Sequence, residues 1–269
     1  MIAPLTDPEF EQFARFILHA AGITLSRGKK ALVAGRLAKR IQERQLASYG
    51  AYFRLLARGA APDEVQTAID LLTTNETYFF REPAHFDLLR RLALEARARA
   101  QPFRVWSAAC SSGEEAYSIA MVLADCLAGS SWQVLGSDIS TRMLARARIG
   151  HYPLQRATHI PPAYLKRFCL RGMGPEEGTL LVQRTLRGSV QFAPINLNEP
   201  LPQLAAFDVI FLRNVMIYFS AETKREVVAR LCALLKPGGY FITSHSESLH
   251  GMSDRMRLVE PSIYQRGGR

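Results

Sequence analysis

The sequence predicts an all-helical N-terminal part followed by an α/β domain built on a parallel sheet. From Asp7 to Leu72, apolar residues recur at spacings of three and four, the period of amphipathic helices. After Pro102, short apolar runs alternate with amphipathic segments, which is the pattern of βαβ units. The stretch from Leu165 to Leu186 breaks this alternation, so we expect a small antiparallel insertion there.

The domain organisation follows from these patterns and from length. A chain of 269 residues can form one large core or two unequal domains. Hydrophobic residues make up 48% and charged residues 22%, which is typical of a folded protein. We expect an N-terminal helical domain with its connecting segment at 1–82. An α/β domain should occupy 83–269, with a small β-subdomain at about 165–190.

Local signals place the elements. Helix starts are indicated by Thr6-Asp7-Pro8 and Pro62-Asp63-Glu64, and Arg90 to Arg99 reads as a solvated helix leading into the second domain. The predicted strands are Phe103 to Ala109, Gln133 to Ser137, Ser189 to Ile195, Phe207 to Leu212, Tyr240 to Ser244 and Arg257 to Tyr264. The predicted helices of the α/β domain are Glu114 to Ala128, Thr141 to Ile149 and Ala221 to Leu235. In the insertion, Arg171 to Pro175 should form a turn and Leu180 to Leu186 an exposed strand.

Composition also restricts location and partners. Met1 to Phe10 lacks the features of a secretory signal, and no apolar stretch approaches the roughly 20 residues that span a bilayer. We therefore expect a cytoplasmic protein without direct membrane insertion. The cysteines contain no Cys-x-x-Cys pair, so we expect buried free thiols and no metal site; they are Cys110, Cys126, Cys169 and Cys232. A net charge of +10 favours an acidic partner.

The first predicted strand runs through Ala108-Ala109-Cys110-Ser111-Ser112-Gly113 directly into a helix that begins with Glu114 and Glu115. Small residues at such a turn let a ligand approach the backbone, at the edge where α/β sheets bind ligands. The three-glycine dinucleotide fingerprint is missing, and two carboxylates disfavour a pyrophosphate. S-adenosylmethionine fits, because it carries a ribose and positive charges but no phosphate. Stabilisation of the helix dipole is the alternative role for the two acids.

Asp138 ends the second predicted strand, where a carboxylate can accept hydrogen bonds from both ribose hydroxyls. Capping of the next helix is the alternative, although Ser140 could serve as that cap. Near the C-terminus, Leu235-Lys236-Pro237-Gly238-Gly239 forms a structural turn before the penultimate strand and looks like the corresponding turn of the class I methyltransferase fold.

Four stretches closely resemble the chemotaxis receptor glutamate methyltransferases, the CheR family. They are Asn75-Glu76-Thr77-Tyr78-Phe79-Phe80-Arg81-Glu82, Trp106 to Ser118, Arg213-Asn214-Val215-Met216-Ile217-Tyr218-Phe219 and His245-Ser246-Glu247. The resemblance covers essentially the whole chain. It implies a Rossmann-like class I S-adenosylmethionine methyltransferase that forms glutamyl methyl esters and releases S-adenosyl-L-homocysteine.

The resemblance also implies a cofactor site. Its expected members are Asn75, Thr77, Arg81, Glu115, Asp138, Asn196, Leu197, Arg213 and Asn214. Arg81 can pair with the methionine carboxylate. Of the two acids at the start of the helix, we expect Glu115 rather than Glu114 to contact the cofactor. For Phe79 and Phe80 we expect packing. Tyr218 is the candidate catalytic residue that orients the substrate carboxylate, with a buried aromatic as the alternative. Arg97 aligns with an arginine proposed to hold the substrate in relatives.

The segment from Arg27 to Arg44 is strongly basic. Val33, Leu37 and Ile41 should form a packing row, while Arg36, Lys39, Arg40 and Arg44 make a cationic edge with Glu43 as the only acid in the segment. A solvated face is one interpretation. The shortage of acids favours a docking surface, and the resemblance implies that it meets the cytoplasmic helical bundle of a receptor. The insertion resembles a β-subdomain that in some relatives adds a receptor's C-terminal peptide as an edge strand.

A nucleic-acid methyltransferase is the alternative function, and the basic pI near 9.8 would suit it. Enzymes that methylate amino groups of nucleic acids usually carry an Asn/Asp-Pro-Pro-aromatic tetrad after the fourth strand. This chain has Asn214-Val215-Met216-Ile217 at that place, so we expect no nucleic-acid partner.

Overall fold

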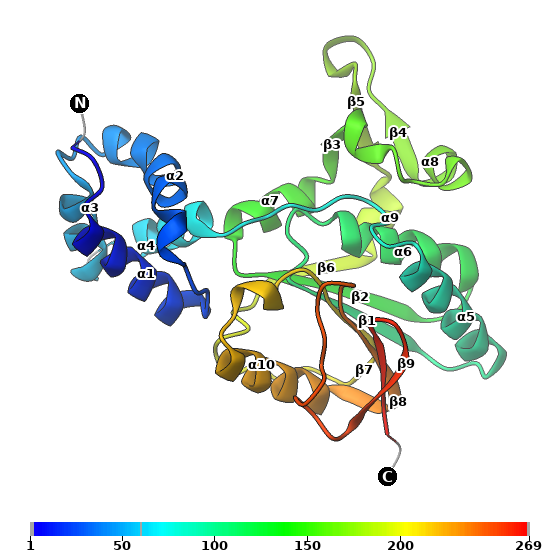
Figure 1. The fold of residues 1–269 in the computed structure, drawn as a ribbon. Coiled ribbons are helices and arrows are strands. Elements are labelled where there is room, and N and C mark those ends of the chain that lie inside the picture. The colour runs from blue at the N-terminus through cyan, green and yellow to red at the C-terminus, as the bar shows by residue number, and fades with distance from the viewer. Residues whose placement is uncertain (1–2, 60, 268–269) are drawn as a thin grey trace.

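The computed structural model describes residues 3–59 and 61–267. Three parts are visible in Figure 1: a helical N-terminal domain, a central α/β domain and a small β-subdomain that projects from it. The predicted fold class is therefore confirmed.

The described part of the N-terminal domain contains four α-helices. They are α1 (Asp7–Ala21), α2 (Lys30–Glu43), α3 (Tyr49–Ala57) and α4 (Pro62–Leu72), with a 3-10 turn at Arg27–Lys29. Both predicted helix starts are confirmed: Thr6 and Glu9 form a reciprocal capping box on α1, and Pro62 opens α4. The packing row of α2 is buried in the core of this domain, as its spacing predicts.

The α/β domain holds a seven-stranded sheet in the order β6-β2-β1-β7-β8-β10-β9 within the described residues. Its strands are β1 (Phe103–Ala108), β2 (Trp132–Asp138), β6 (Val190–Pro194), β7 (Phe207–Leu212), β8 (Leu235–Ile242), β9 (Met256–Glu260) and β10 (Ile263–Arg266). The five strands β6, β2, β1, β7 and β8 are parallel, and β10 is antiparallel to both of its neighbours, β8 and β9. The strand order reverses between β1 and β7, and ligands bind at such a switch point.

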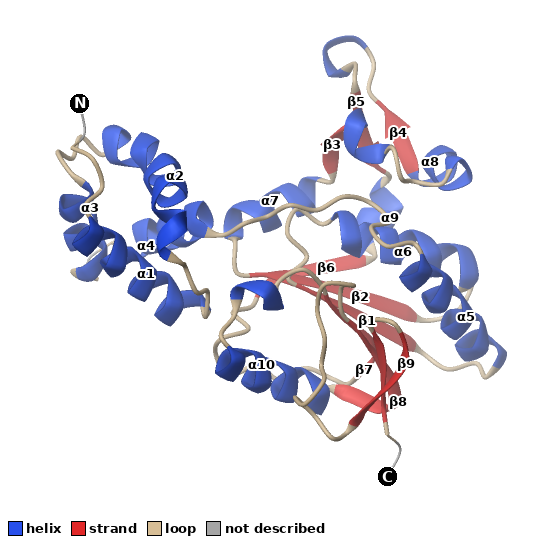
Figure 2. Ribbon diagram, viewed as in Figure 1, coloured by secondary structure: helices blue, strands red, loops and turns tan. Residues whose placement is uncertain are grey.

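Helices cover both faces of this sheet (Figure 2). They are α5 (Ala84–Ala98), α6 (Glu114–Cys126), α7 (Thr141–Ile149) and α10 (Ala221–Ala233). One core cluster contains residues of α5 and α6, and the other contains residues of α10. The prediction of a solvated helix at Arg90 to Arg99 is wrong for one face, because Ala93 and Ala96 of α5 are buried, and α5 packs against α6.

Two further predictions need correction at the C-terminal end of the sheet. Arg257 to Tyr264 forms two antiparallel strands, β9 and β10, because the chain reverses at Pro261 and Ser262. Ser262 has φ +62°, a turn conformation that apolar alternation does not reveal. Strand β8 begins at Leu235 and not at Tyr240, since the glycine turn is a bulge within the strand where its register with β7 shifts.

The β-subdomain is larger than predicted. Its sheet has the order β3-β5-β4, formed by β3 (His151–Pro153), β4 (Cys169–Arg171) and β5 (Thr179–Val182). It therefore begins at His151, outside the predicted 165–190. The exposed strand predicted at Leu180 to Leu186 is instead the central strand β5, followed by α9 (Arg184–Gly188). The helix α8 (Pro162–Phe168) and two 3-10 turns, Leu154–Ala157 and Gly174–Glu176, complete this part.

Several polar contacts hold the two large domains together, and two sets of them lie beside the sheet edge described above. Asp70 of α4 accepts hydrogen bonds from the Thr141 hydroxyl at 3.1 Å and the Arg142 amide at 3.3 Å, at the start of α7. After α1, the Thr24 amide donates to the Tyr218 carbonyl at 2.8 Å, and Ile23 bridges to Phe219. Residues far apart in sequence thus form one seam.

The four cysteines are buried and free, as predicted. Among the helices within 3–59 and 61–267, none combines the length and the apolarity that crossing a bilayer requires.

Candidate active site at the seam between the domains

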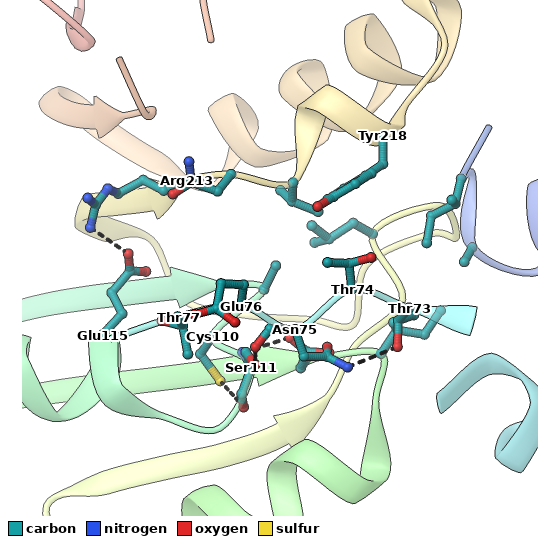
Figure 3. A pocket seen from close by; sticks show the side chains of 18 of the residues that line it. Thr73, Thr74, Asn75, Glu76, Thr77, Cys110, Ser111, Glu115, Arg213 and Tyr218 are labelled. Atoms are coloured by element: carbon teal, nitrogen blue, oxygen red, sulfur yellow. Dashed lines mark hydrogen bonds and ion pairs between the residues drawn. The ribbon is translucent and has the colours of Figure 1, made fainter. Parts of the chain in front are cut away.

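A cleft that is partly open to solvent lies at the carboxyl ends of the central strands. Segments from both domains line it: the end of α1, the connecting segment after α4, and the loops after β1, β2, β6 and β7. Figure 3 shows several of these side chains around the opening. Every predicted cofactor residue lines this cleft, and so does Tyr218.

The loop after β1 has an unusual backbone. Ala109 and Ser111 adopt positive φ angles of +69° and +50°, and Gly113 has φ +95°. A Cβ atom at Gly113 would lie 2.8 Å from the Cβ of Ala147, so this position excludes every other residue. Strained backbone persists only where the surrounding structure holds it. The loop therefore keeps a fixed shape and leaves its backbone open to the cleft.

Asp138 organises this loop from the end of β2. Its two carboxylate oxygens accept the Ser111 and Ser140 amides, both at 2.8 Å. The cap of α7 is Ser140, whose hydroxyl accepts the Met143 amide, so capping is not the role of Asp138. Burial raises the pKa of Asp138, while the two amide hydrogen bonds act in the opposite direction. A carboxylate has about four acceptor positions, which leaves capacity for ligand hydroxyls.

Glu115 and Arg213 form a buried pair on the opposite wall. Arg213 donates to Glu115 at 2.9 Å, and the Ser107 hydroxyl donates to the other carboxylate oxygen at 2.7 Å. The Arg213 guanidinium also donates to the Arg81 carbonyl at 2.5 Å, which fixes the connecting segment against the sheet. The neighbouring Glu114 is fully buried, pairs with Arg156 and does not line the cleft. The geometry thus favours Glu115 over Glu114.

The connecting segment crosses the cleft as an extended chain. The Asn75 amide group donates to Thr73 at 3.2 Å, and the Asn75 carbonyl accepts the Ser111 hydroxyl at 3.0 Å. The Arg81 side chain packs over the Tyr78 ring at 5.4 Å, and its guanidinium makes one long hydrogen bond. Arg81 therefore retains donors for a ligand. The buried Phe79 and Phe80 pack in the core, as predicted.

After β6, Asn196 and Leu197 line the cleft beside the N-terminal domain. The Asn196 amide group donates to the Ala20 carbonyl at the end of α1, at 2.7 Å. Leu197 is buried and supplies an apolar wall. Asn214, which follows β7, has φ +58°, so a second strained loop borders the cleft.

Tyr218 lies at the seam, and its hydroxyl points into the cleft (Figure 3). The side chain is only half-buried, so it is not a core aromatic. Arg36 of α2 reaches the same place, where it donates to the Leu72 carbonyl at 2.7 Å and the Thr74 hydroxyl at 2.9 Å. Burial lowers the pKa of Arg36, and the nearby Tyr218 acts in the opposite direction. Tyr218 thus lines the cleft, and Arg36 lies behind it, bonded to the lining residue Thr74.

Glu247 is a residue of this region that we did not single out from the sequence. Its carboxylate accepts the amides of Asn214 at 2.8 Å and Ile217 at 3.2 Å. It also accepts the amide and hydroxyl of Ser244, at 3.2 and 2.8 Å. Glu247 thereby ties the loop that carries Tyr218 to the loop after β8. Its presence in the His245-Ser246-Glu247 motif was the available signal.

The structure does not bring Arg97 to the cleft. Arg97 lies in the last turn of α5 and donates to the Cys126 carbonyl at 3.2 Å, at the end of α6. Helix α6 begins at the cleft, so its C-terminal end is about 18 Å away, at 1.5 Å per residue. The assignment of Arg97 to the substrate carboxylate is wrong on this geometry, because the arginine-rich helix gave no unique register.

The basic edge of α2 has more compensating charge than the sequence indicated. The buried Glu64 of α4 pairs with Arg40 at 2.6 Å and Arg44 at 3.2 Å. The hydrogen bond from Arg40 lowers the pKa of Glu64. Glu43 is the only acid within the segment, but the inference that this edge lacks compensating acids is wrong, since Glu64 comes from another helix. Lys39, whose side chain is 87% exposed, pairs only loosely with Glu43 at 3.9 Å.

Comparison with known proteins agrees with this site. A cleft at the switch point of a parallel sheet, with Asp138 at the end of β2, defines an S-adenosylmethionine-binding methyltransferase domain: residues 75–264 match the family described as "CheR methyltransferase, SAM binding domain". Residues 8–73 match "CheR methyltransferase, all-alpha domain". The chain belongs to the CheR methyltransferase family, as the sequence motifs indicated.

Similar proteins extend over nearly the whole chain. The chemotaxis protein methyltransferase of Escherichia coli is 42% identical, over 97% of this chain and 91% of its own length. Chemotaxis protein methyltransferase 2 of Pseudomonas aeruginosa is also 42% identical, over 96% and 93%. The enzyme of Salmonella typhimurium is 40% identical, over 97% and 90%.

The substitution Glu247→Gln should loosen the loop that carries Tyr218. An amide keeps one accepting oxygen and turns a donor toward a backbone N–H, so we expect a loss of about 1–3 kcal/mol in the free energy of unfolding. Urea denaturation measures it. The matched control is Glu222→Gln, which neutralises an exposed acid in the first turn of α10 and should cost less than about 1 kcal/mol. Equal losses in the two variants would contradict the proposed anchoring.

Proposed function

We propose that this protein transfers a methyl group from S-adenosylmethionine to glutamate side chains of chemotaxis receptors, forming glutamyl methyl esters. The observation that carries the proposal is the joint lining of one cleft by the cofactor candidates and by Tyr218, in a chain of the CheR family. Glutamate as the acceptor rests on the family and on the absence of the nucleic-acid tetrad at Asn214 to Ile217.

The residues of the cleft fit S-adenosylmethionine, which supplies the transferable methyl group when bound. Asp138 retains acceptor capacity for ribose hydroxyls, and Arg81 retains donors for the methionine carboxylate. Glu115 lines the cleft as an acceptor, and its ion pair with Arg213 balances its charge. Asn75, Thr77, Asn196, Leu197, Arg213 and Asn214 complete the proposed binding set.

The acceptor needs little chemical activation. A glutamate side chain has a reference pKa near 4.3, so its carboxylate is already ionised at neutral pH and needs no general base. Alignment of the reacting atoms is then the main contribution of the protein. Transfer neutralises charge, and a seam closed by two domains favours this by excluding water.

Tyr218 and Arg36 are the proposed groups for the acceptor. A phenolic hydroxyl can donate to a carboxylate oxygen, and a guanidinium can hold the other oxygen by a charge-assisted bond. Arg36 of α2 bonds to Thr74, which lines the cleft, and lies near Tyr218. A receptor helix that docks along α2 would therefore bring its glutamate to this pair.

The proposed docking edge consists of Arg36, Lys39, Arg40 and Arg44. Its members differ in how available they are to a partner, because Glu64 forms ion pairs with Arg40 and Arg44 within the domain. Lys39 is the most exposed member, with a side chain 87% exposed. We propose that this edge meets the acidic surroundings of the methylated glutamates on the cytoplasmic helical bundle, which puts the reaction in the cytoplasm. Charge complementarity of this kind chiefly affects association.

The β-subdomain offers a second contact to the same receptors. Strand β4 is an edge of its sheet, and Leu170 on that strand is 51% exposed. An edge strand with free backbone groups can accept an extended peptide. Addition of a receptor C-terminal peptide at β4 is therefore our proposal for this surface.

Methyl labelling tests the reaction itself. Receptor-containing membranes and total RNA are offered side by side with methyl-labelled S-adenosylmethionine. We expect label in receptor protein, released as methanol by mild base because esters hydrolyse under those conditions. Label in RNA, or protein label that resists mild base, would contradict glutamyl ester formation.

Tyr218→Phe tests the positioning role of the hydroxyl. Loss of one hydrogen bond worth about 1.4 kcal/mol in the transition state should lower kcat roughly tenfold. Cofactor affinity, measured by calorimetry, should change less than twofold, because the ring remains in place. An unchanged kcat would remove the Tyr218 hydroxyl from the mechanism.

Lys39→Glu tests the docking edge without disturbing the domain interior. We expect the KM for receptor to rise roughly fivefold, the factor that corresponds to about 1 kcal/mol, while cofactor affinity stays unchanged. Arg225→Glu, on the exposed face of α10, makes the same charge change away from α2 and is the control. An equal rise in KM for both variants would indicate a general charge effect and not a docking edge.

A further inference from the structure

A cluster of two histidines and a glutamate lies beside the cleft and has no part in the proposed reaction. Glu82 ends the connecting segment, His85 lies in the first turn of α5, and His245 follows β8. Ser262, in the turn between β9 and β10, touches both imidazole rings. Three places in the chain, the segment 82–85, His245 and Ser262, thus bring their side chains to one point.

Three potential ligand atoms face one another in this cluster. The Nδ1 atom of His85 lies 3.5 Å from the Oε2 atom of Glu82, and the Nε2 atom of His245 lies 3.8 Å from that oxygen. The three atoms all lie within 4.8 Å of one another. Ligands around a zinc ion stand about 2.0–2.2 Å from the metal, so a cation between these atoms would need only small side-chain adjustments.

Two of these atoms are buried and make no hydrogen bond to any described residue, although Glu82 Oε2 has an ion pair with Arg213 at 3.3 Å. Within the described residues, neither Glu82 Oε2 nor His85 Nδ1 makes a hydrogen bond, and the His85 side chain is fully buried. Buried polar atoms almost always have a hydrogen-bond partner, so a pair without one that faces the same point needs an explanation.

Ser262 determines which ring nitrogens carry protons. When its hydroxyl donates to the Pro261 carbonyl at 2.5 Å, its oxygen is left to accept from the imidazoles. It therefore accepts from Nε2–H of His85 at 2.8 Å and from Nδ1–H of His245 at 3.3 Å. In neutral rings the remaining nitrogens are then unprotonated. These are the two nitrogens that face Glu82.

In these tautomers the two ring nitrogens and the Glu82 oxygen turn electron pairs toward one another, and the Arg213 guanidinium lies 3.3 Å from that oxygen. A neutral imidazole is the form that binds metal ions. Glu82 and Ser262 both hold positive φ angles, +58° and +62°, so strained backbone aims two members of the cluster.

We propose that Glu82, His85 and His245 bind a divalent zinc ion through Oε2, Nδ1 and Nε2, with Ser262 fixing the two histidine tautomers. Three protein ligands with an open fourth position describe a zinc site accessible to water. His245 is on the surface, with a side chain 57% exposed, which gives the ion a path of entry. Histidine ligands of metals usually donate their second N–H to a nearby oxygen, and Ser262 supplies that oxygen to both rings.

The charge near the site permits a cation. The Arg213 guanidinium lies 3.3 Å from Glu82 Oε2, but its charge is already balanced by the buried pair with Glu115 at 2.9 Å. The proposal departs from our expectation of no metal site, which considered only cysteine spacing. His85 and His245 belong to different parts of the chain, so no local spacing of the two histidines predicts a metal site.

Calorimetric titration of the chelator-treated full chain with zinc chloride, under reducing conditions, tests the site. We expect one saturable zinc ion per chain in the wild type. His245→Ala removes an exposed ligand without touching the core, and it should weaken binding by about tenfold or more. Failure of the wild type to bind one ion, or equal affinity in His245→Ala, would overturn the proposal.

Two further variants separate this site from other metal-binding groups. His151→Ala removes a histidine that pairs with Glu176 in the β-subdomain, and it should leave the affinity unchanged. Ser262→Gly tolerates the positive φ but removes the shared acceptor, so affinity should fall roughly tenfold. Unchanged affinity in Ser262→Gly would contradict the proposed tautomers and thus this geometry.

Titration with cobalt chloride reads out the ligands directly. A site of two imidazoles and a carboxylate should give visible cobalt absorption without a thiolate charge-transfer band, and His245→Ala should abolish it. A thiolate band would assign the ion to one of the cysteines and overturn the proposal.

Discussion

The buried guanidinium of Arg213 is the interaction on which the site depends. It joins three segments, because it pairs with Glu115 of α6, donates to the Arg81 carbonyl of the connecting segment and lies beside Glu82. Its side chain is only 2% exposed, so its charge must be compensated within the protein. Breaking a buried ion pair by removing one partner costs about 3–5 kcal/mol. The connecting segment is thereby held against the sheet, and the cleft keeps its two walls.

The sequence predicted most elements and the membership of the cleft, because both depend on local or linear patterns. Helix caps such as Thr6, the apolar runs of β1 and β7, and motif residues such as Tyr218 are readable from neighbouring positions. What the sequence did not predict depends on contacts between distant segments. Glu64 neutralises Arg40 from another helix, and Glu247 anchors the loop of Tyr218 from beyond β8.

The errors have physical causes of the same kind. The apolar alternation of Arg257 to Tyr264 continues through the chain reversal at Ser262, so it predicted one strand. A positive φ angle does not change the hydrophobic pattern and cannot be read from it. Arg97 was misplaced because several arginines on one helix are equivalent in sequence and differ only in what they meet in the fold. The predicted range of the β-subdomain was too short, because β3 is only three residues long and lies apart in sequence from its partner β5.

The seam between Thr24 and the Tyr218 carbonyl gives the cleft a thermodynamic property. The cleft is lined by residues of both domains, so a ligand that fills it contacts both at once. Such a ligand stabilises the arrangement in which the two domains are docked, relative to one in which they are separated. The free energy gained is set by the difference in its affinity for these two arrangements. Linkage is reciprocal: whatever tightens the docking of the helical domain raises the affinity for the ligand. Occupancy of the cleft and closure of the two domains therefore belong to a single equilibrium.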